Sequence, residues 1–505
     1  MKSYKSFLFL TLVACLSLCS CYHEFPGGGG GGGTGTANVS FVLVADTPPT
    51  NLGLVSLKVV PTTITLTPTT GTATSFSINS GNGYTFDLVR LQSDSGYLGT
   101  VPSVETGDYT SVTVGFSSVQ IAFYNGTGVA LTNPVCPAND ACIATFAGPF
   151  TATITTSQTI SGNAGYGIDI NLANAITVSG TTLSFNLGNS NAASIYALPR
   201  TPTNLASGQL DLIEDFTGVV SLTNSGVTIT PALAVNRAPI TATANSSTVL
   251  DEDPTQTLCT NPTQGSVSSC VSSNQAASMD AILNSDGTFT VQEIEPLLAT
   301  LQDTVEGTIV AINNSTQFVI VVGDIIPAAT NSLIGSLGIG SPLTVNLSTG
   351  PAFYVDSKGL PVEGSFPNSY NFFIQSTDTT GLFLGQNVAV HVTAFTVANG
   401  STIASSTANT VTLRWSRFIA TPTGASTSSL FNVTGLPGYF GFTPTSILQT
   451  EIFLGAQGTE GATNLDGITN GSPPGTGAVG IRALYIENPG YTLSPAFFAA
   501  KVRQP

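Results

Sequence analysis

The chain has 505 residues, of which 8% are charged and 41% are hydrophobic. This composition excludes a charge-rich disordered protein, and the length allows two to four domains. Twelve Lys and Arg against 28 Asp and Glu give a formal net charge of −16, so the chain cannot neutralise a row of phosphates and nucleic-acid binding is excluded. With only two histidines, His23 and His391, most histidine-based catalysis and zinc chemistry are disfavoured.

Residues 1–21 have the features of a bacterial lipoprotein signal peptide. Lys2 and Lys5 precede an apolar stretch over 7–18 that is too short for an ordinary membrane span. A lipobox places Leu and small residues before the lipidated cysteine. We predict lipidation at Cys21, because the chain turns polar and Gly-rich directly after it, with Cys15 as the alternative and secretion without lipid as a third possibility. The expected location is the outer membrane or cell surface.

Residues 22–37 form the expected tether. Seven consecutive glycines occupy 27–33, and such a segment would lose too much conformational entropy on folding to be ordered. It predicts a flexible stalk between the lipid and the folded part.

Four cysteines remain downstream, in two local pairs. In an exported chain, Cys136 with Cys142 and Cys259 with Cys270 predict two disulfides. A four-cysteine metal site is the alternative, disfavoured because no C-x-x-C pair is present.

The folded part has the pattern of an all-β protein. Segments such as 39–43 and 111–116 favour strands, and the second alternates apolar and small polar residues with period two. Turn dipeptides such as Asp286-Gly287 separate the segments. The best helical competitors, 276–283 and 296–301, are each about two turns long.

Residues 38–205 resemble a family of bacterial domains of unknown function that are classed as carbohydrate-binding-like, Ig-like β-sandwiches. The resemblance rests on 39–46, 86–91, 98–100, 105–112 and 167–172. It implies a β-sandwich in a lipoprotein context and no established activity. Independently, Glu105-x-Gly107-x-Tyr109 predicts a tyrosine corner, with Tyr109 on the face opposite Val112; ligand stacking is the alternative.

A repeat begins after the sandwich. Residues 215–222 are echoed by 304–311, and each is followed by a turn and a second apolar strand. The pattern is similar to tandem small β-barrels of a second uncharacterised family. It predicts two or three barrels arranged as beads on a string, with boundaries at 206–300, 301–427 and an incomplete unit over 428–505.

Two acidic segments are weak calcium candidates. Asn284, Asp286, Gly287 and Glu293 partly match a calcium-binding loop, but Ile282 stands at its first position, and a hairpin turn is the simpler interpretation. The cluster Asp251, Glu252 and Asp253 is most simply a solvated turn, with calcium as the alternative. No metal or other cofactor is expected.

Aromatic residues supply the ligand-binding candidates. Trp415 is the only tryptophan, and Tyr439, Phe440 and Phe442 follow a turn signal that predicts a loop tip. Core packing is the favoured interpretation for all four side chains, and a pyranose ring stacked on them is the alternative.

Catalysis is not expected. His391 is interpreted as an exposed strand residue, because it shares its strand face with Ala389 and Thr393, opposite three valines. A Ser-His-Asp triad is disfavoured, because no Gly-x-Ser-x-Gly elbow accompanies it. We therefore predict a lipid-anchored, non-catalytic binding module with a glycan as the favoured ligand, by analogy of fold. The alternative is a structural spacer or adhesin that contacts an envelope protein by strand-edge pairing. A third possibility is a glycan hydrolase that uses two of Glu214, Asp215, Glu293 and Glu295.

Overall fold

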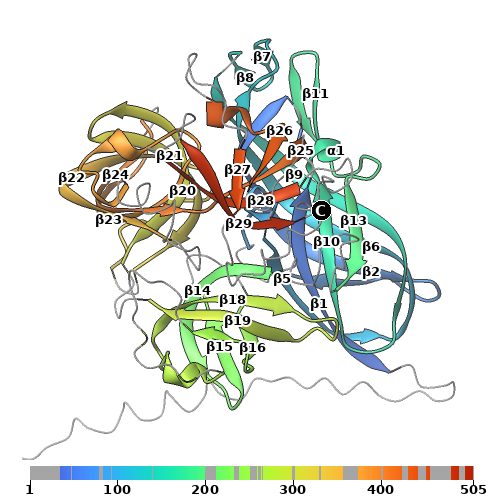
Figure 1. Ribbon diagram of the computed structural model, residues 1–505. Helices are drawn as coiled ribbons and strands as arrows, with labels where there is room; N and C mark the ends of the chain where they lie inside the picture. The colour runs from blue at the N-terminus through green and yellow to red at the C-terminus, as the bar shows by residue number, and fades with distance from the viewer. Residues whose placement is uncertain are drawn as a thin grey trace, which may run out of the picture.

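The computed structural model describes residues 35–503 except for 47, 50, 79–83, 93, 139, 199–211, 232–237, 251–258, 260–262, 264, 298–301, 329–330, 357–372, 400–401, 424–429, 442–450, 455–478 and 488–494. Strands dominate these residues (Figure 1), which confirms the predicted all-β class. The helices among them fall short of the length and apolarity that a bilayer span requires.

The first domain is a β-sandwich of two sheets. One sheet has the order β13 (Ala193–Ala197), β10 (Ala164–Asn171), β1 (Thr36–Asp46) and β5 (Gly96–Glu105). The other has the order β3 (Thr74–Ser77), β2 (Leu52–Pro68), β6 (Gly107–Asn125) and β9 (Ala141–Ile160), with β4 (Phe86–Asp87) paired to β2. The short elements η1 (Arg90–Gln92), β7 (Leu131–Thr132), β8 (Val135–Cys136), α1 (Leu172–Ala175), β11 (Ile176–Ser179) and β12 (Thr182–Phe185) complete it.

Strand β1 shows how the sandwich meets its neighbour. Phe41 and Leu43 face the sandwich core, whereas Val42 between them belongs to the core of the next domain. A strand covered on both faces reads as a continuous apolar run, which explains the uninterrupted hydrophobic sequence over 41–45.

The tyrosine corner is confirmed. The Tyr109 hydroxyl donates to the backbone oxygen of Glu105 at 2.7 Å. The predicted orientation was wrong, since Tyr109 lies in the same core as Val112. A shift of register between Tyr109 and Ser111 returns the ring to the inner face.

Three five-stranded barrels follow the sandwich, and each has the same strand order. The first contains β14 (Leu212–Leu222), β15 (Gly226–Thr230), β16 (Ile240–Thr243), β18 (Ala276–Leu283) and β19 (Phe289–Pro296), with β17 (Val249–Leu250) and η3 (Val267–Ser269) added. The second contains β20 (Thr304–Asn314), β21 (Gln317–Ile326), β22 (Pro342–Val355), β23 (Asn387–Thr396) and β24 (Ala404–Arg414), with η4 (Thr379–Gly381). The third contains β25 (Ser416–Thr423), β26 (Leu430–Thr434), β27 (Glu451–Leu454), β28 (Val479–Ile486) and β29 (Ala496–Arg503), with η5 (Gly438–Gly441).

In each barrel the first three strands form an antiparallel meander, the third lies parallel to the fifth, and the first and fourth pair antiparallel. This is the strand order of a small Greek-key barrel of the OB type.

The first and second barrels also share a glycine at an equivalent position of the first strand, where the backbone of the second strand comes too close for a side chain. A Cβ at Gly218 would lie 2.3 Å from the Thr230 backbone oxygen, and one at the equivalent Gly307 would lie 2.3 Å from that of Val321.

The C-terminal unit differs from its prediction. It is a complete barrel, and its first strand, β25, lies before the expected boundary at 427. Trp415 alone separates β24 from β25. The second and third barrels therefore join without a linker.

The domains pack against one another instead of forming beads on a string (Figure 1). Leu484 and Ile486 of the third barrel lie in the core of the second. Val55 of the sandwich and Val321 of the second barrel join the core of the third. Shared cores of this kind fix the orientation of neighbouring domains.

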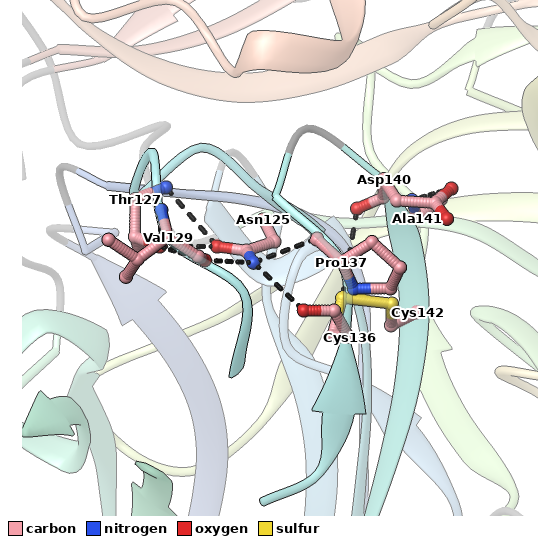
Figure 2. The surroundings of a disulfide bond; sticks show 8 residues. All are labelled: Asn125, Thr127, Val129, Cys136, Pro137, Asp140, Ala141 and Cys142. Atoms are coloured by element: carbon pink, nitrogen blue, oxygen red, sulfur yellow. Dashed lines mark hydrogen bonds between the residues drawn. A yellow bond between two sulfur atoms is a disulfide. The ribbon is translucent and has the colours of Figure 1, made fainter. Parts of the chain in front are cut away.

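Both predicted disulfides are present. Around Cys136–Cys142, the Asn125 side-chain amide donates to the backbone oxygens of Val129 and Pro137, each at 2.9 Å (Figure 2). The bond and Asn125 together order the loop at the end of β6.

Replacing Tyr109 by Phe should lower the free energy of unfolding by about 1 kcal/mol, because it removes one hydrogen bond and leaves the ring in place. Chemical denaturation measures the change. Tyr354→Phe is the matched control, because this side chain is 37% exposed and its removal of a hydroxyl should cost nothing measurable. Equal effects of the two substitutions would contradict the corner.

Candidate functional site: a buried ionic junction

The three aromatic ligand candidates that the structure describes are not surface residues. Trp415 is 0% exposed, and Tyr439 and Phe440 are 4% and 5% exposed. Phe440 packs edge-on against Phe418 and Phe497 inside the third barrel. The core packing that the sequence favoured is therefore observed at these positions, because η5 folds back onto the barrel and carries its rings into the core. Phe442 lies outside the described residues.

The structure describes one of the two calcium candidates. Residues 284–288 form the hairpin turn between β18 and β19, and Asp286 accepts hydrogen bonds from the hydroxyl and backbone nitrogen of Thr288. These bonds lower the pKa of Asp286, so the ionised carboxylate stabilises the turn. Asp251, Glu252 and Asp253, like Cys15 and Cys21, lie outside the described residues. Within the described ranges, no group of three His, Cys, Asp or Glu residues is arranged to hold a metal.

His391 lies half-buried on β23, where its Nδ1 is 2.7 Å from the Asn409 side-chain oxygen. Thr304 and Thr410 lie directly opposite His391 on the two neighbouring strands.

The most unusual chemistry of the described residues lies where the four domains meet. Four arginines and six carboxylates form one continuous network there, which we call the ionic junction: Arg90, Asp94, Glu214, Asp215, Glu306, Asp324, Asp356, Arg414, Arg417 and Arg482. Every domain contributes. Charged side chains are seldom fully buried unless they are paired, so this cluster needs a physical account.

Arg417, at the start of β25, is the centre of the junction. Its Nε lies 2.9 Å from Asp94 of the sandwich, and its Nη2 lies 2.9 Å from Asp215 of the first barrel. Its Nη1 lies 3.7 Å from Glu306 of the second barrel. One guanidinium thus connects all four domains, and only the planar fork of Arg has the donors to do so.

Glu306, on β20, lies beside three of the four arginines of the junction. It accepts from Arg90 at 2.8 Å and lies 3.4 Å from the Arg414 Nε. The Asn387 amide donates to it at 2.6 Å. Arg414 also pairs with Asp356 and, at 3.2 Å, with Asp215.

Arg482 occupies the deepest position. Its side chain and that of Glu214 are both 0% exposed, and their Nε and Oε2 atoms are 3.2 Å apart. The guanidinium carbon lies 4.8 Å from the centre of the Trp415 ring, within the range of a cation–π contact. The only tryptophan therefore packs against the junction.

A β-bulge positions the first-barrel acids. The pairing of β14 with β18 shifts between Ile213 and Phe216, and Asp215 adopts a φ of +54°. Asp tolerates this left-handed conformation better than most residues. The bulge directs both Glu214 and Asp215 into the junction, and the Asp215 nitrogen donates to Asp280 at 2.7 Å.

The electrostatics follow from this geometry. Burial alone would raise the pKa of Glu306, but Arg90, Arg414 and Arg417 lower it below its ordinary value. Burial would lower the pKa of Arg90, and Glu306 and Asp324 raise it instead. Burial raises the pKa of neighbouring Asp87. The charged groups of the junction therefore stabilise one another's ionised forms.

The junction holds the domains together through paired charges. Glu214 and Asp215, nominated as hydrolase acids, are paired with Arg482 and Arg417. Glu293 is buried on β19 opposite Asp280. A glycosidase needs two carboxylates that face a cleft able to take a sugar, and Glu214 and Asp215 are instead paired with guanidinium groups.

Reasoning from sequence did not identify this junction. Its signal was the placement of arginines inside apolar strands, as in Ile481-Arg482-Ala483 and Arg414-Trp415-Ser416-Arg417, in a chain with only 12 basic residues.

Comparisons with protein-family models, curated proteins and solved structures gave no match. The interpretation of the site therefore rests on its own geometry.

Replacing Glu306 by Gln should lower the free energy of unfolding by about 3 kcal/mol or more, because it leaves buried guanidinium groups without a charge partner. Denaturation followed by Trp415 fluorescence measures this, since the ring is buried beside the junction. Glu105→Gln makes the same chemical change at an exposed position and should alter stability by no more than about 0.5 kcal/mol. Comparable losses in both variants would contradict the role of the junction.

Acid should open the junction. The pKa of Glu306 is depressed in the folded state, so its contribution to stability is fully present above its unfolded pKa and is lost as pH falls through the folded value. The raised pKa of Asp87 has the opposite sign and offsets part of this loss. The temperature of the unfolding midpoint should decrease as the pH is lowered below about 4.5. For Glu306→Gln, the midpoint temperature should decrease less over the same pH range. Identical acid dependence in the two proteins would exclude Glu306 as its source.

Proposed function

We propose that the protein is a rigid, non-catalytic module of the bacterial cell envelope, tethered by lipid at Cys21 or Cys15, that acts as a spacer or adhesin through protein contacts. The observation that carries this proposal is the ionic junction, because one arginine, Arg417, joins all four domains. A spacer must keep its outer surface at a fixed distance and orientation, and shared cores reinforced by buried ion pairs meet that need.

The described surface also favours a spacer or adhesin over a glycan-binding module. The three described aromatic candidates are buried, whereas sugar recognition by stacking needs exposed rings. Part of the outer face of the β3-β2-β6-β9 sheet is instead covered by Thr and Ser hydroxyls. Glycan binding is retained as the competing hypothesis to be tested.

Cells that display the full chain should attach to surfaces coated with envelope proteins more than cells that lack the gene, and soluble glycans should not compete. Glu306→Gln should reduce attachment at unchanged surface amounts, because the domains lose their fixed arrangement, and Glu105→Gln should not. Competition by a glycan, with or without calcium, would favour the lectin-like alternative. Attachment that does not depend on the chain would refute an adhesive role.

A further inference from the structure

The loop that follows β6 exposes several apolar side chains together. Val135, on β8, is 84% exposed, and Val129 is 48% exposed. Ala130, next to Val129, and Pro137, two residues after Val135, are exposed as well. We call these four residues the apical patch. Among the described residues, no other large apolar side chain is as exposed as Val135, and apolar residues that gather on a surface mark interaction sites.

The loop that carries the apical patch is held in one conformation. The Asn125 side-chain amide donates to the backbone oxygens of Val129 and Pro137, which brings the two ends of the patch together (Figure 2). The Cys136–Cys142 disulfide ties the loop to β9. A surface that is ordered before binding loses little conformational entropy on binding, so these contacts prepare the patch for a partner.

The apical patch lies at the end of the sandwich away from the predicted tether. The chain enters the sandwich at Thr36, which pairs with Glu105 at the end of β5. From Gly107, β6 runs for 19 residues to Asn125, which is about 60 Å of extended strand. Figure 1 shows β7 and β8 at the top of the view, with β1 and β5 below them. A spacer anchored before Thr36 therefore presents the patch at its distal end.

We propose that the apical patch docks onto an apolar site, bordered by Lys or Arg side chains, on a second protein of the envelope. The inference rests on the proposed function and names its contact surface and the chemistry of its partner. Charge determines the sign of that chemistry. Between Arg90 and Arg200 the sequence has no Lys, Arg or His, and residues 126–140 carry only Asp140 as a charged residue. With the net charge of −16, this surface attracts a basic protein and repels an acidic one.

Other ligand classes lack the side chains that would recognise them. Residues 126–140 contain no Trp, Tyr or Phe on which a sugar ring could stack. They contain no Lys or Arg that could pair with anionic lipid headgroups. A second copy carries the same net charge of −16, so self-association is opposed. A protein with a basic rim is the occupant that both the apolar surface and the charge favour.

Attachment of cells that display the full chain tests the patch. The probes are beads coated with the basic envelope proteins that a cation exchanger retains, beads coated with the acidic envelope proteins, and vesicles of anionic phospholipid. Val135→Lys places a like charge against the basic rim and should reduce attachment to the basic beads at least tenfold. Val135→Asp should reduce it less, because its charge complements the rim. Val397→Lys is the matched control, because Val397 is 58% exposed on the second barrel, and it should attach as the wild type does.

Folding is checked by the unfolding midpoint, which should be the same in all three variants because both valines are exposed. Equal losses in Val135→Lys and Val397→Lys overturn the proposal, as does a greater loss in Val135→Asp than in Val135→Lys. Equal attachment to the acidic beads, or attachment to the vesicles alone, overturns it too. Attachment that persists in Val135→Lys but falls in Glu306→Gln removes the apical patch and leaves the adhesive role standing. Attachment that does not depend on the chain refutes both.

Discussion

Removing ten charged side chains from water at one place is the constraint on which the arrangement of domains depends. Burial of an unpaired charge is costly, and the cost is offset only when every partner is in position. The partners here come from four domains, so no domain can move without leaving a guanidinium or carboxylate uncompensated. Buried ion pairs often add little net stability compared with apolar packing. Their effect in this protein is to specify one relative arrangement.

The small number of basic residues also explains the composition of the surface. A chain with 12 basic residues that commits Arg90, Arg414, Arg417 and Arg482 to its interior has few left for its exterior. Thr and Ser then take the outward positions of the long strands, where their β-branching or small size suits the pleat. The buried arginines and the scarcity of basic residues on the surface thus follow from one composition.

The local structure of this protein was readable from its sequence, and its assembly was not. Period-two patterning identified the strands, and local cysteine spacing identified both disulfides, because these features depend on neighbours in the chain. The Tyr109 bulge and the closure of the third barrel depend on contacts between distant segments. The ionic junction is the extreme case: Arg417 meets Asp215 across 202 residues and Arg90 meets Glu306 across 216. An ion pair between such distant residues leaves no periodic pattern in the sequence.

The position of Arg482 near the C-terminus has a consequence for biogenesis. A chain is synthesised from its N-terminus, so Glu214 and Asp215 are made long before the arginines of β25 and β28. The sandwich and the first barrel can form their strands at that stage, but their junction carboxylates remain hydrated until those arginines have been made. A chain truncated before β25 would never close the junction. Compactness is therefore a property of chains that include β25 and β28, which gives cellular proteases a physical basis for removing shorter ones.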